Sequence, residues 1–189
     1  LTGAFSALII VLGITKLGII PVGAIASISI LQIPVILAAC IIGLPAALFT
    51  GAVFGIMSLI QAAMSPTGAL DFLFVNPFCS VLPRMLTGAF AWLIWTGLSK
   101  IKKMPKSICA GITGLLATLA HTVLVIGALY LFVGSSVRQI MDGAGFFVVL
   151  ASLSFNATLE AIASTLVCTA VFLGLYISGN KKSKLSEEE

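Results

Sequence analysis

The sequence predicts an all-α integral membrane protein, a single bundle of six transmembrane helices. Hydrophobic residues make up 60% of the chain and charged residues only 8%, whereas about a quarter of the residues in a typical soluble domain are charged. The mean hydropathy is +1.22. The apolar runs are continuous and approach the roughly 20 residues that cross a ~30 Å hydrocarbon core, so helices are favoured over the short alternating segments of a membrane β-barrel.

Glycine, proline and polar residues divide the chain into six apolar runs. Lys16 and Pro21 end the first run, and a turn at 43–45 separates the second from the third. A polar connection over 64–76 precedes the fourth run, and Pro105 precedes the fifth, because proline ends a helix. The predicted spans cover residues 1–20, 24–42, 46–63, 77–99, 107–133 and 145–178.

Two lysine clusters set the predicted orientation. One lies between the fourth and fifth spans, and the other follows the sixth span. Basic loops stay in the cytoplasm, and six spans place both clusters and both termini on that side. Residues 1–180 are therefore predicted to form one membrane domain, and 181–189 a charged cytoplasmic tail. The clusters are Lys100, Lys102, Lys103 and Lys106, then Lys181, Lys182 and Lys184; Lys16, Asp71, Arg138 and Asp142 fall at the outer face.

Arg84 lies inside a long apolar run, between Phe72 and Leu98. A charge at the bilayer centre costs roughly 2.5–3.5 kcal/mol on insertion scales, so such residues face a protein interior or a water-filled cavity. Pro83 removes a backbone donor and loosens the helix at this point. The planar guanidinium suits a carboxylate or a phosphate. An internal ion pair with Glu160 is the alternative, and both interpretations can hold together.

Other polar side chains inside the spans are candidates for the same site. Asn156 and Glu160 are four residues apart and share one face of the sixth helix, and Ser152 and Ser164 extend that stripe. The spacing leaves open whether the stripe lines a ligand pocket or ties helices together. His121 is the only histidine, and a single histidine is a poor metal site, so we expect it to form hydrogen bonds in the core or to a ligand.

Three further side chains are polar candidates of a less specific kind. Asn76 stands where the fourth span begins, so it is either a helix cap or a ligand contact. Gln32 and Gln61 lie in the second and third spans. No nucleophile, base and acid occur in a catalytic arrangement, so neither an enzyme nor a cofactor is expected. The four cysteines lack metal-ligand spacing and are expected to be small buried hydrophobes; they are Cys40, Cys79, Cys109 and Cys168.

Small residues recur on two of the spans. Gly3 and Ala7 form a small-xxx-small pair on the first span, and such pairs let helices approach closely. Both ordinary packing within the bundle and contact with a partner subunit remain open for this pair. The third span contains the small residues Ala46, Ala47, Gly51, Ala52 and Gly55.

Several stretches resemble the substrate-binding S component of energy-coupling factor (ECF) vitamin transporters. One is the opening Leu1-Thr2-Gly3-Ala4-Phe5-Ser6-Ala7-Leu8. The most specific is Asn76-Pro77-x-x-Ser80-Val81-Leu82-Pro83-Arg84-x-Leu86-x-Gly88. Two others are Ile33-Pro34-Val35-Ile36 and His121-Thr122-Val123-Leu124-Val125-x-Gly127-x-Leu129-Tyr130-Leu131. The resemblance covers most of the chain.

The resemblance implies a small bacterial membrane protein that binds one water-soluble vitamin from the outside. It also implies partners, namely a transmembrane coupling subunit and two cytoplasmic ATPases, and a toppling movement in the membrane that releases the cargo. In this family, small residues on the first helix contact the coupling subunit, which points to Gly3 and Ala7. The pocket lies near the outer face, and the implied substrate-binding candidates are Asn76, Arg84, His121, Asn156 and Glu160.

Among the subfamilies, the loop Met64-Ser65-Pro66-Thr67 followed by Asn76-Pro77 most resembles the pantothenate type. Pantothenate is an anion, and either Arg84 or Arg138 would suit its carboxylate. One position departs from the pattern, because the residue before Thr122-Val123-Leu124 is often asparagine in the family and is His121 in this chain. Pyridoxine, a hydroxymethylpyrimidine, riboflavin and folate therefore stay open as substrates.

Three functions of other classes are weighed against this one. A stand-alone carrier or channel is disfavoured because no convincing internal repeat is present. An intramembrane enzyme would need paired acid and base residues, and only one carboxylate lies inside a span. A structural partner without any ligand would need Arg84 for folding alone.

Overall fold

The computed structural model describes residues 1–22, 26–66, 70–140, 142–143 and 145–185, without the side chains of 19–28, 152 and 179–185. The predicted start of the second span at residue 24 and Thr67 of the loop motif therefore lie outside the described residues. The side chain of Ser152 and those of the lysines in the tail also lie outside them.

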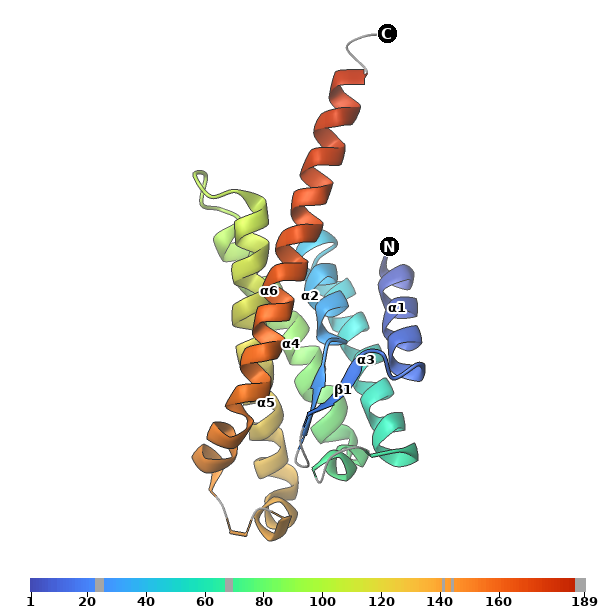
Figure 1. The fold of residues 1–189 in the computed structure, drawn as a ribbon, viewed down its shortest axis with the longest axis vertical. Helices are drawn as coiled ribbons and strands as arrows, with labels where there is room; N and C mark the ends of the chain where they lie inside the picture. The colour runs from blue at the N-terminus through green and yellow to red at the C-terminus, as the bar shows by residue number, and fades with distance from the viewer. Residues whose placement is uncertain (23–25, 67–69, 141, 144, 186–189) are drawn as a thin grey trace.

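Helices form nearly the whole described structure, and one two-stranded hairpin interrupts them (Figure 1). The all-α class predicted for the bundle is thus confirmed, with the short hairpin as an addition. The elements, in order, are α1 Thr2–Ile14, β1 Ile19–Val22, β2 Ala26–Ser29, α2 Gln32–Ile41, α3 Leu44–Met64, the 3-10 helix η1 Asp71–Val75, α4 Pro77–Leu98, α5 Lys106–Ile140 and α6 Phe146–Leu185.

Four helices are long and apolar enough to cross a membrane: α3, α4, α5 and the 153–178 part of α6. The chain is therefore a multi-pass helical membrane protein. The predicted count of six spans is not confirmed, because α1 and α2 have 13 and 10 residues. At 1.5 Å per residue these helices are about 20 and 15 Å long, short of the ~30 Å core of a bilayer.

The boundaries predicted for the first two spans are wrong. α1 ends at Ile14, and α2 begins only at Gln32, with the hairpin between them. Lys16 has a φ of 57°, which lies outside the helical region and breaks the run. Pro21 cannot donate the hydrogen bond that a helix needs at its interior, and the β-branched residues around it favour strands. Hydropathy alone does not distinguish such a segment from a membrane helix.

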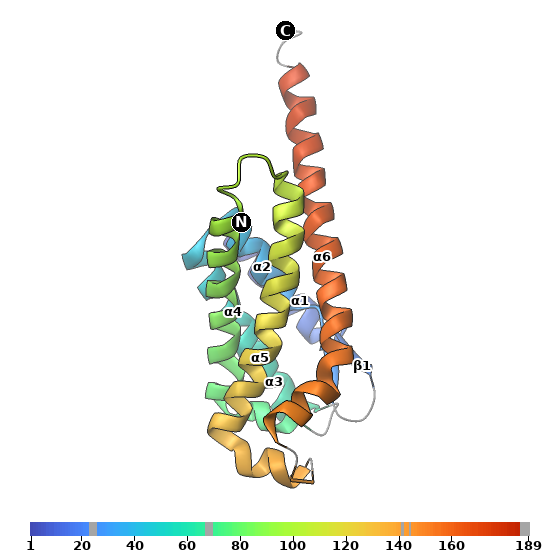
Figure 2. The ribbon, with the colours of Figure 1, turned by 90° about the vertical axis from the view of Figure 1, so that its left-hand side faces the viewer.

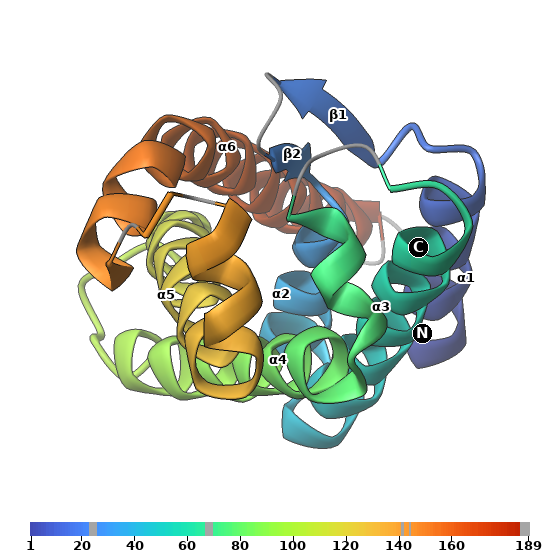
Figure 3. The ribbon, with the colours of Figure 1, turned by 90° about the horizontal axis from the view of Figure 1, so that it is seen from below.

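The short helix α2 is the centre of the bundle. Every residue from Gln32 to Cys40 is buried, and the end-on view shows α3, α4, α5 and α6 arranged around it, with α1 outside α3 (Figure 3). The hairpin comes directly before α2 in the chain, and its strand β2 lies against α6. Its strands pair in antiparallel register, with Ile19 opposite Ser29 and Val22 opposite Ala26.

The two ends of the bundle differ in what they carry. The amino-terminus, the end of α6 and the loop between α4 and α5 lie at one end, whereas η1 and the end of α5 lie at the other (Figures 1 and 2). The basic cluster of that loop and the amino-terminus therefore share one end. The four cysteines are free and buried, as predicted.

Helices α3 and α4 approach each other at glycine positions. A Cβ atom at Gly88 would lie 2.5 Å from the carbonyl oxygen of Ala47, and one at Gly55 would lie 2.5 Å from the Cα atom of Val81. Real Cβ atoms do not come that close to backbone, so only glycine permits this contact. The small residues predicted on the third span therefore serve packing within the bundle.

We expect Gly88→Ala to destabilise the protein by about 1–3 kcal/mol, because the added methyl group would push α3 and α4 apart. The change should lower the melting temperature in detergent. Gly97→Ala on the same helix is the matched control, since an added carbon there meets nothing within 4 Å and alanine is a better helix former than glycine. Equal melting temperatures for the two variants would contradict the close packing.

Candidate functional site

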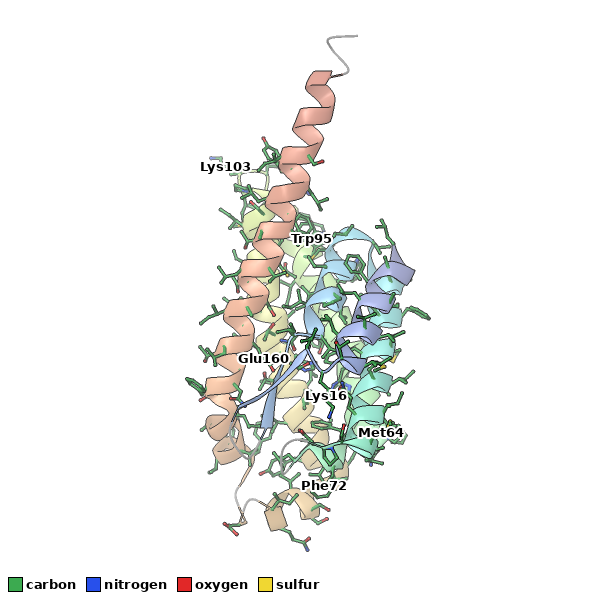
Figure 4. The ribbon with its side chains drawn as sticks, turned by 45° about the vertical axis from the view of Figure 1, so that its right-hand side comes forward. Lys16, Met64, Phe72, Trp95, Lys103 and Glu160 are labelled. Carbon is green, nitrogen blue, oxygen red and sulfur yellow. The ribbon has the colours of Figure 1, made fainter. Side chains whose placement is uncertain are left out.

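A cavity of about 400 Å³ lies between the hairpin, α3, α4, α5, α6 and the loop that carries η1. Its volume falls in the ~300–1,000 Å³ range of small-molecule sites. Apolar side chains of α5 form much of its wall, and a few polar groups converge on it. Figure 4 shows two lining residues, Glu160 and Lys16, away from the end that carries Lys103. Four of the five predicted substrate-binding residues line it: Arg84, His121, Asn156 and Glu160.

Arg84 is held by a backbone group that Pro83 leaves free. In a regular helix the carbonyl of Cys79 accepts a hydrogen bond from the N–H four residues later, but that residue is Pro83, which has no N–H. The Nη1 atom of Arg84 donates to this carbonyl at 2.8 Å. The side chain is only 6% exposed, so the adjacent Pro83 and Arg84 form one unit in which the proline supplies the acceptor for the guanidinium.

Two aromatic rings complete the surroundings of the guanidinium. The Cζ atom of Arg84 lies 4.5 Å from the ring centroid of Phe74 on η1 and 5.5 Å from that of Phe54 on α3, distances at which a cation is attracted to a ring face. A Cβ atom at Gly51 would lie 2.6 Å from the Arg84 carbonyl oxygen, so α3 packs directly against this turn of α4. The arginine is therefore fixed from three elements.

The guanidinium of Arg84 is not fully hydrogen-bonded by the described residues. Within the described part of the chain, the buried Nε atom has no hydrogen-bond partner. An unpaired buried donor costs about 1–3 kcal/mol, and more when it carries charge. Arg84 lines the cavity, so an anionic group bound there would lie beside a buried positive charge.

Glu160 is occupied by the hairpin and by α2. Its Oε1 atom accepts a hydrogen bond from the backbone N–H of Ser29 at 2.6 Å, and its Oε2 atom accepts one from Nε2 of Gln32 at 3.3 Å. The ion pair with Arg84 considered from the sequence is not formed between these described side chains, since Arg84 donates to Cys79 instead. Glu160 therefore fixes the end of β2 at the wall of the cavity.

The polar stripe of α6 both lines the cavity and ties helices together, the two roles that its spacing in the sequence left open. On one side Asn156 and Glu160 line the cavity. On the other side Gln32 donates to Thr118 at 3.3 Å, and Thr118 donates to Ser164 at 2.9 Å. This chain of hydrogen bonds joins α2, α5 and α6 in the core, so the same helix face both lines a cavity and ties the bundle together.

The hydrogen bonds of Thr87 assign the tautomer of His121. The Thr87 hydroxyl lies 2.8 Å from the carbonyl oxygen of Pro83 and 3.0 Å from Nδ1 of His121. The hydroxyl has one proton, and the nearer carbonyl can only accept, so Nδ1 is assigned as the donor to Thr87. Nε2 is then an acceptor on a residue that lines the cavity. The imidazole also stacks on Phe54, with 5.8 Å between ring centroids.

Other predicted residues lie away from the cavity. Asn76 is the N-cap of α4, and its Oδ1 atom accepts a hydrogen bond from the N–H of Phe78 at 3.0 Å, so the helix-cap interpretation is the one observed. Arg138, the second arginine considered for an anion, is exposed on α5. Gly3 and Ala7 are exposed on α1.

Several residues of the site carry no specific signal in the sequence. Phe54 and Phe74 are two of twelve phenylalanines, and nothing in their spacing indicates contact with a charge. Thr87 was not distinguished from the other hydroxyl residues of the spans. Lys16 was predicted only for the outer face, yet it lines the cavity at the turn after α1. The one sequence feature that could have indicated this role is that Lys16 interrupts an apolar run.

Comparison with known proteins identifies the family. The family described as "ECF transporter, substrate-specific component" matches residues 1–172. The Pantothenate transporter PanT of Leuconostoc mesenteroides is 32% identical over 114 residues, which are 58% of this chain and 56% of that protein. The Pantothenic acid transporter PanT of Lactococcus lactis is 26% identical over 158 residues, 76% of this chain and 74% of that protein.

The resemblance read from the sequence motifs is thus confirmed. The matched region spans just over half the length of the Leuconostoc protein, whereas the family match covers α1 to α5 and most of the membrane-crossing part of α6. The chain belongs to the family of substrate-specific components of ECF transporters.

Proposed function

We propose that this protein is the substrate-capture subunit of an ECF-type vitamin importer and that its substrate is pantothenate. The observation that carries the proposal is the buried guanidinium of Arg84, whose Nε atom is unpartnered in the described structure and which lines a cavity of about 400 Å³. Such a site favours an anion. The two relatives named as pantothenate transporters support pantothenate as that anion.

The chemistry of pantothenate suits the polar groups of the cavity. The molecule has a carboxylate at one end, an amide in the middle and two hydroxyl groups at the other end. Arg84 would receive the carboxylate through a charge-assisted hydrogen bond. His121 Nε2 offers an acceptor to an N–H or O–H group of the ligand, and Asn156 and Glu160 offer oxygen atoms toward the hydroxyl end. The apolar wall of α5 suits the methyl groups.

Other vitamins suit the site less well. Pyridoxine, hydroxymethylpyrimidine and riboflavin lack a carboxylate for Arg84. Folate has carboxylates but is far larger than pantothenate. The family membership also favours a component that works with an ECF module over a stand-alone carrier or channel.

The proposed orientation places the cavity toward the outside. The lysines of the loop between α4 and α5 lie at one end of the bundle, and the cavity residues Lys16 and Glu160 lie away from that end (Figure 4). Basic loops are retained in the cytoplasm. The termini would then be cytoplasmic, and the vitamin would enter from the opposite side.

The exposed face of α1 is the proposed contact with the transmembrane coupling subunit. Gly3 and Ala7 are both exposed, and a Cβ atom at Gly3 would meet nothing within 4 Å. This small-xxx-small pair is therefore not used for packing inside the bundle, and it allows close approach by a helix of another subunit. Two cytoplasmic ATPases would drive the complex, with toppling of this subunit releasing the vitamin.

Arg84→Ala should weaken pantothenate binding at least about tenfold, because a buried charged hydrogen bond is worth several kcal/mol. Panthenol, in which an alcohol replaces the carboxylate, should bind the variant and the wild type with similar affinity. Titration calorimetry of the purified protein measures both ligands. Arg138→Ala is the matched control and should bind both ligands as the wild type does. An unchanged pantothenate affinity in a folded Arg84→Ala variant would remove Arg84 from the site.

Thr87→Val should weaken pantothenate binding several-fold, because the hydroxyl that holds the Nδ1–H tautomer of His121 is lost while the side-chain shape is kept. Thr87→Ser retains the hydroxyl and should bind as the wild type does. Since His121 is the only histidine, nitrogen-15 NMR of histidine-labelled protein reports its tautomer directly. A proton on Nε2 in the wild-type protein would contradict the assignment.

Gly3→Leu and Ala7→Leu should each reduce assembly with the coupling subunit and the ATPases, because the larger side chain blocks close approach by a helix. Pantothenate affinity of the isolated subunit should stay unchanged. Gly97→Leu, also at an open position, is the control and should assemble normally. Affinity pulldown of the complex measures assembly, and normal recovery of both α1 variants would exclude this interface.

A further inference from the structure

Pro83 is a proline inside a helix, a position that usually destabilises the helix. It lies in the buried part of α4, next to the cavity residue Arg84. Helix packing does not by itself require a proline there. Both ends of the Pro83 backbone affect a residue of the site. The N–H that proline lacks leaves the Cys79 carbonyl to Arg84, and the Pro83 carbonyl accepts a hydrogen bond from Thr87.

We infer that Pro83 is a positioning residue for the ligand's anion, since it frees the Cys79 carbonyl to anchor the guanidinium of Arg84 at the wall of the cavity. The inference rests on the proposed function for the identity of the anion. The orientation of the guanidinium is then set by the backbone of the preceding turn, where a proline takes the place of a residue with an N–H donor.

The anchoring bond determines which atoms of the guanidinium are left for a ligand. Nη1 is used by the Cys79 carbonyl at 2.8 Å. Phe74 and Phe54 lie against the guanidinium and limit its movement. The Nε atom has no partner in the described structure and is enclosed by protein, so a ligand would meet the guanidinium at the part that lines the cavity. A side chain held in one orientation before the ligand arrives loses less conformational freedom on binding.

Replacing Pro83 by a residue with an N–H introduces a competitor for that carbonyl. The new N–H would form the ordinary helical hydrogen bond to Cys79, and Arg84 would lose its anchor. The Pro83 carbonyl would remain in any such variant, so Thr87 and His121 should keep their hydrogen bonds. A substitution of Pro83 therefore tests the anchoring of Arg84 alone, since the other hydrogen bonds of the site are kept.

The decisive experiment compares pantothenate and panthenol binding by Pro83→Ala and Pro83→Val, the second of which keeps more of the proline's volume. Both variants should weaken pantothenate binding at least about tenfold, the effect of one lost anchored hydrogen bond, with panthenol affinity nearly unchanged. The melting temperature should equal or exceed that of the wild type, because proline is disfavoured inside helices. Pro77→Ala is the control, since the first position of a helix does not need its N–H.

Two binding results would overturn the inference. One is unchanged pantothenate affinity in folded Pro83 variants. The other is an equal loss for pantothenate and panthenol together with a lower melting temperature, which would indicate a purely structural role.

A second measurement does not depend on the ligand. The chain has two arginines, Arg84 and Arg138, so nitrogen-15 NMR of arginine-labelled protein gives two side-chain sets, and Arg138→Lys assigns them. In the wild type, Arg84 should show hindered rotation of its guanidinium, and Pro83→Ala should release it while the His121 signals stay in place. Unrestricted rotation in the wild type, or unchanged hindrance in the variant, would overturn the inference.

The two measurements distinguish the failure of this inference from the failure of the proposed function. If the wild-type protein binds no pantothenate, the proposed substrate is wrong. The NMR result alone then decides whether Pro83 positions Arg84.

Discussion

A positive charge buried among helices is the constraint on which the candidate site depends. Arg84 is 6% exposed, and a charge so far from water must be balanced by hydrogen bonds, aromatic faces or an opposite charge. The protein supplies the first two through Cys79, Phe74 and Phe54. It does not pair Arg84 with Glu160, which binds the hairpin and α2. Arg84 itself lines the cavity.

The shortness of α1 and α2 explains how the cavity is built. Two helices that stop part of the way through the bundle leave space at one end, and the hairpin that joins them borders that space. Non-helical backbone at membrane depth is tolerated where protein covers it or where it lines a water-filled cavity. The hydrogen bond from the Ser29 N–H to Glu160 fixes the end of the hairpin in such a place. The short helices α1 and α2 and the hairpin between them therefore account for both the architecture of the bundle and the position of the cavity.

Parts of this arrangement could be predicted from the sequence because they rest on strong physical preferences. Long apolar runs identified α3 to α6, and the cost of an intramembrane charge identified Arg84. The hairpin could not be predicted in the same way, since a strand of β-branched residues has the hydropathy of a helix. Asn76 suited both a cap and a ligand contact, and only its bond to Phe78 decided between them. The rings beside Arg84 come from distant segments, and contacts of that kind leave no local pattern.

Pantothenate recognition by Arg84 is tested most directly by an experimental structure of the protein with pantothenate bound. We predict that the carboxylate lies within hydrogen-bonding distance of the Arg84 guanidinium, while Nη1 keeps its bond to the Cys79 carbonyl. A ligand bound elsewhere, or a carboxylate held by other groups without contact to Arg84, would contradict the central role assigned to this arginine.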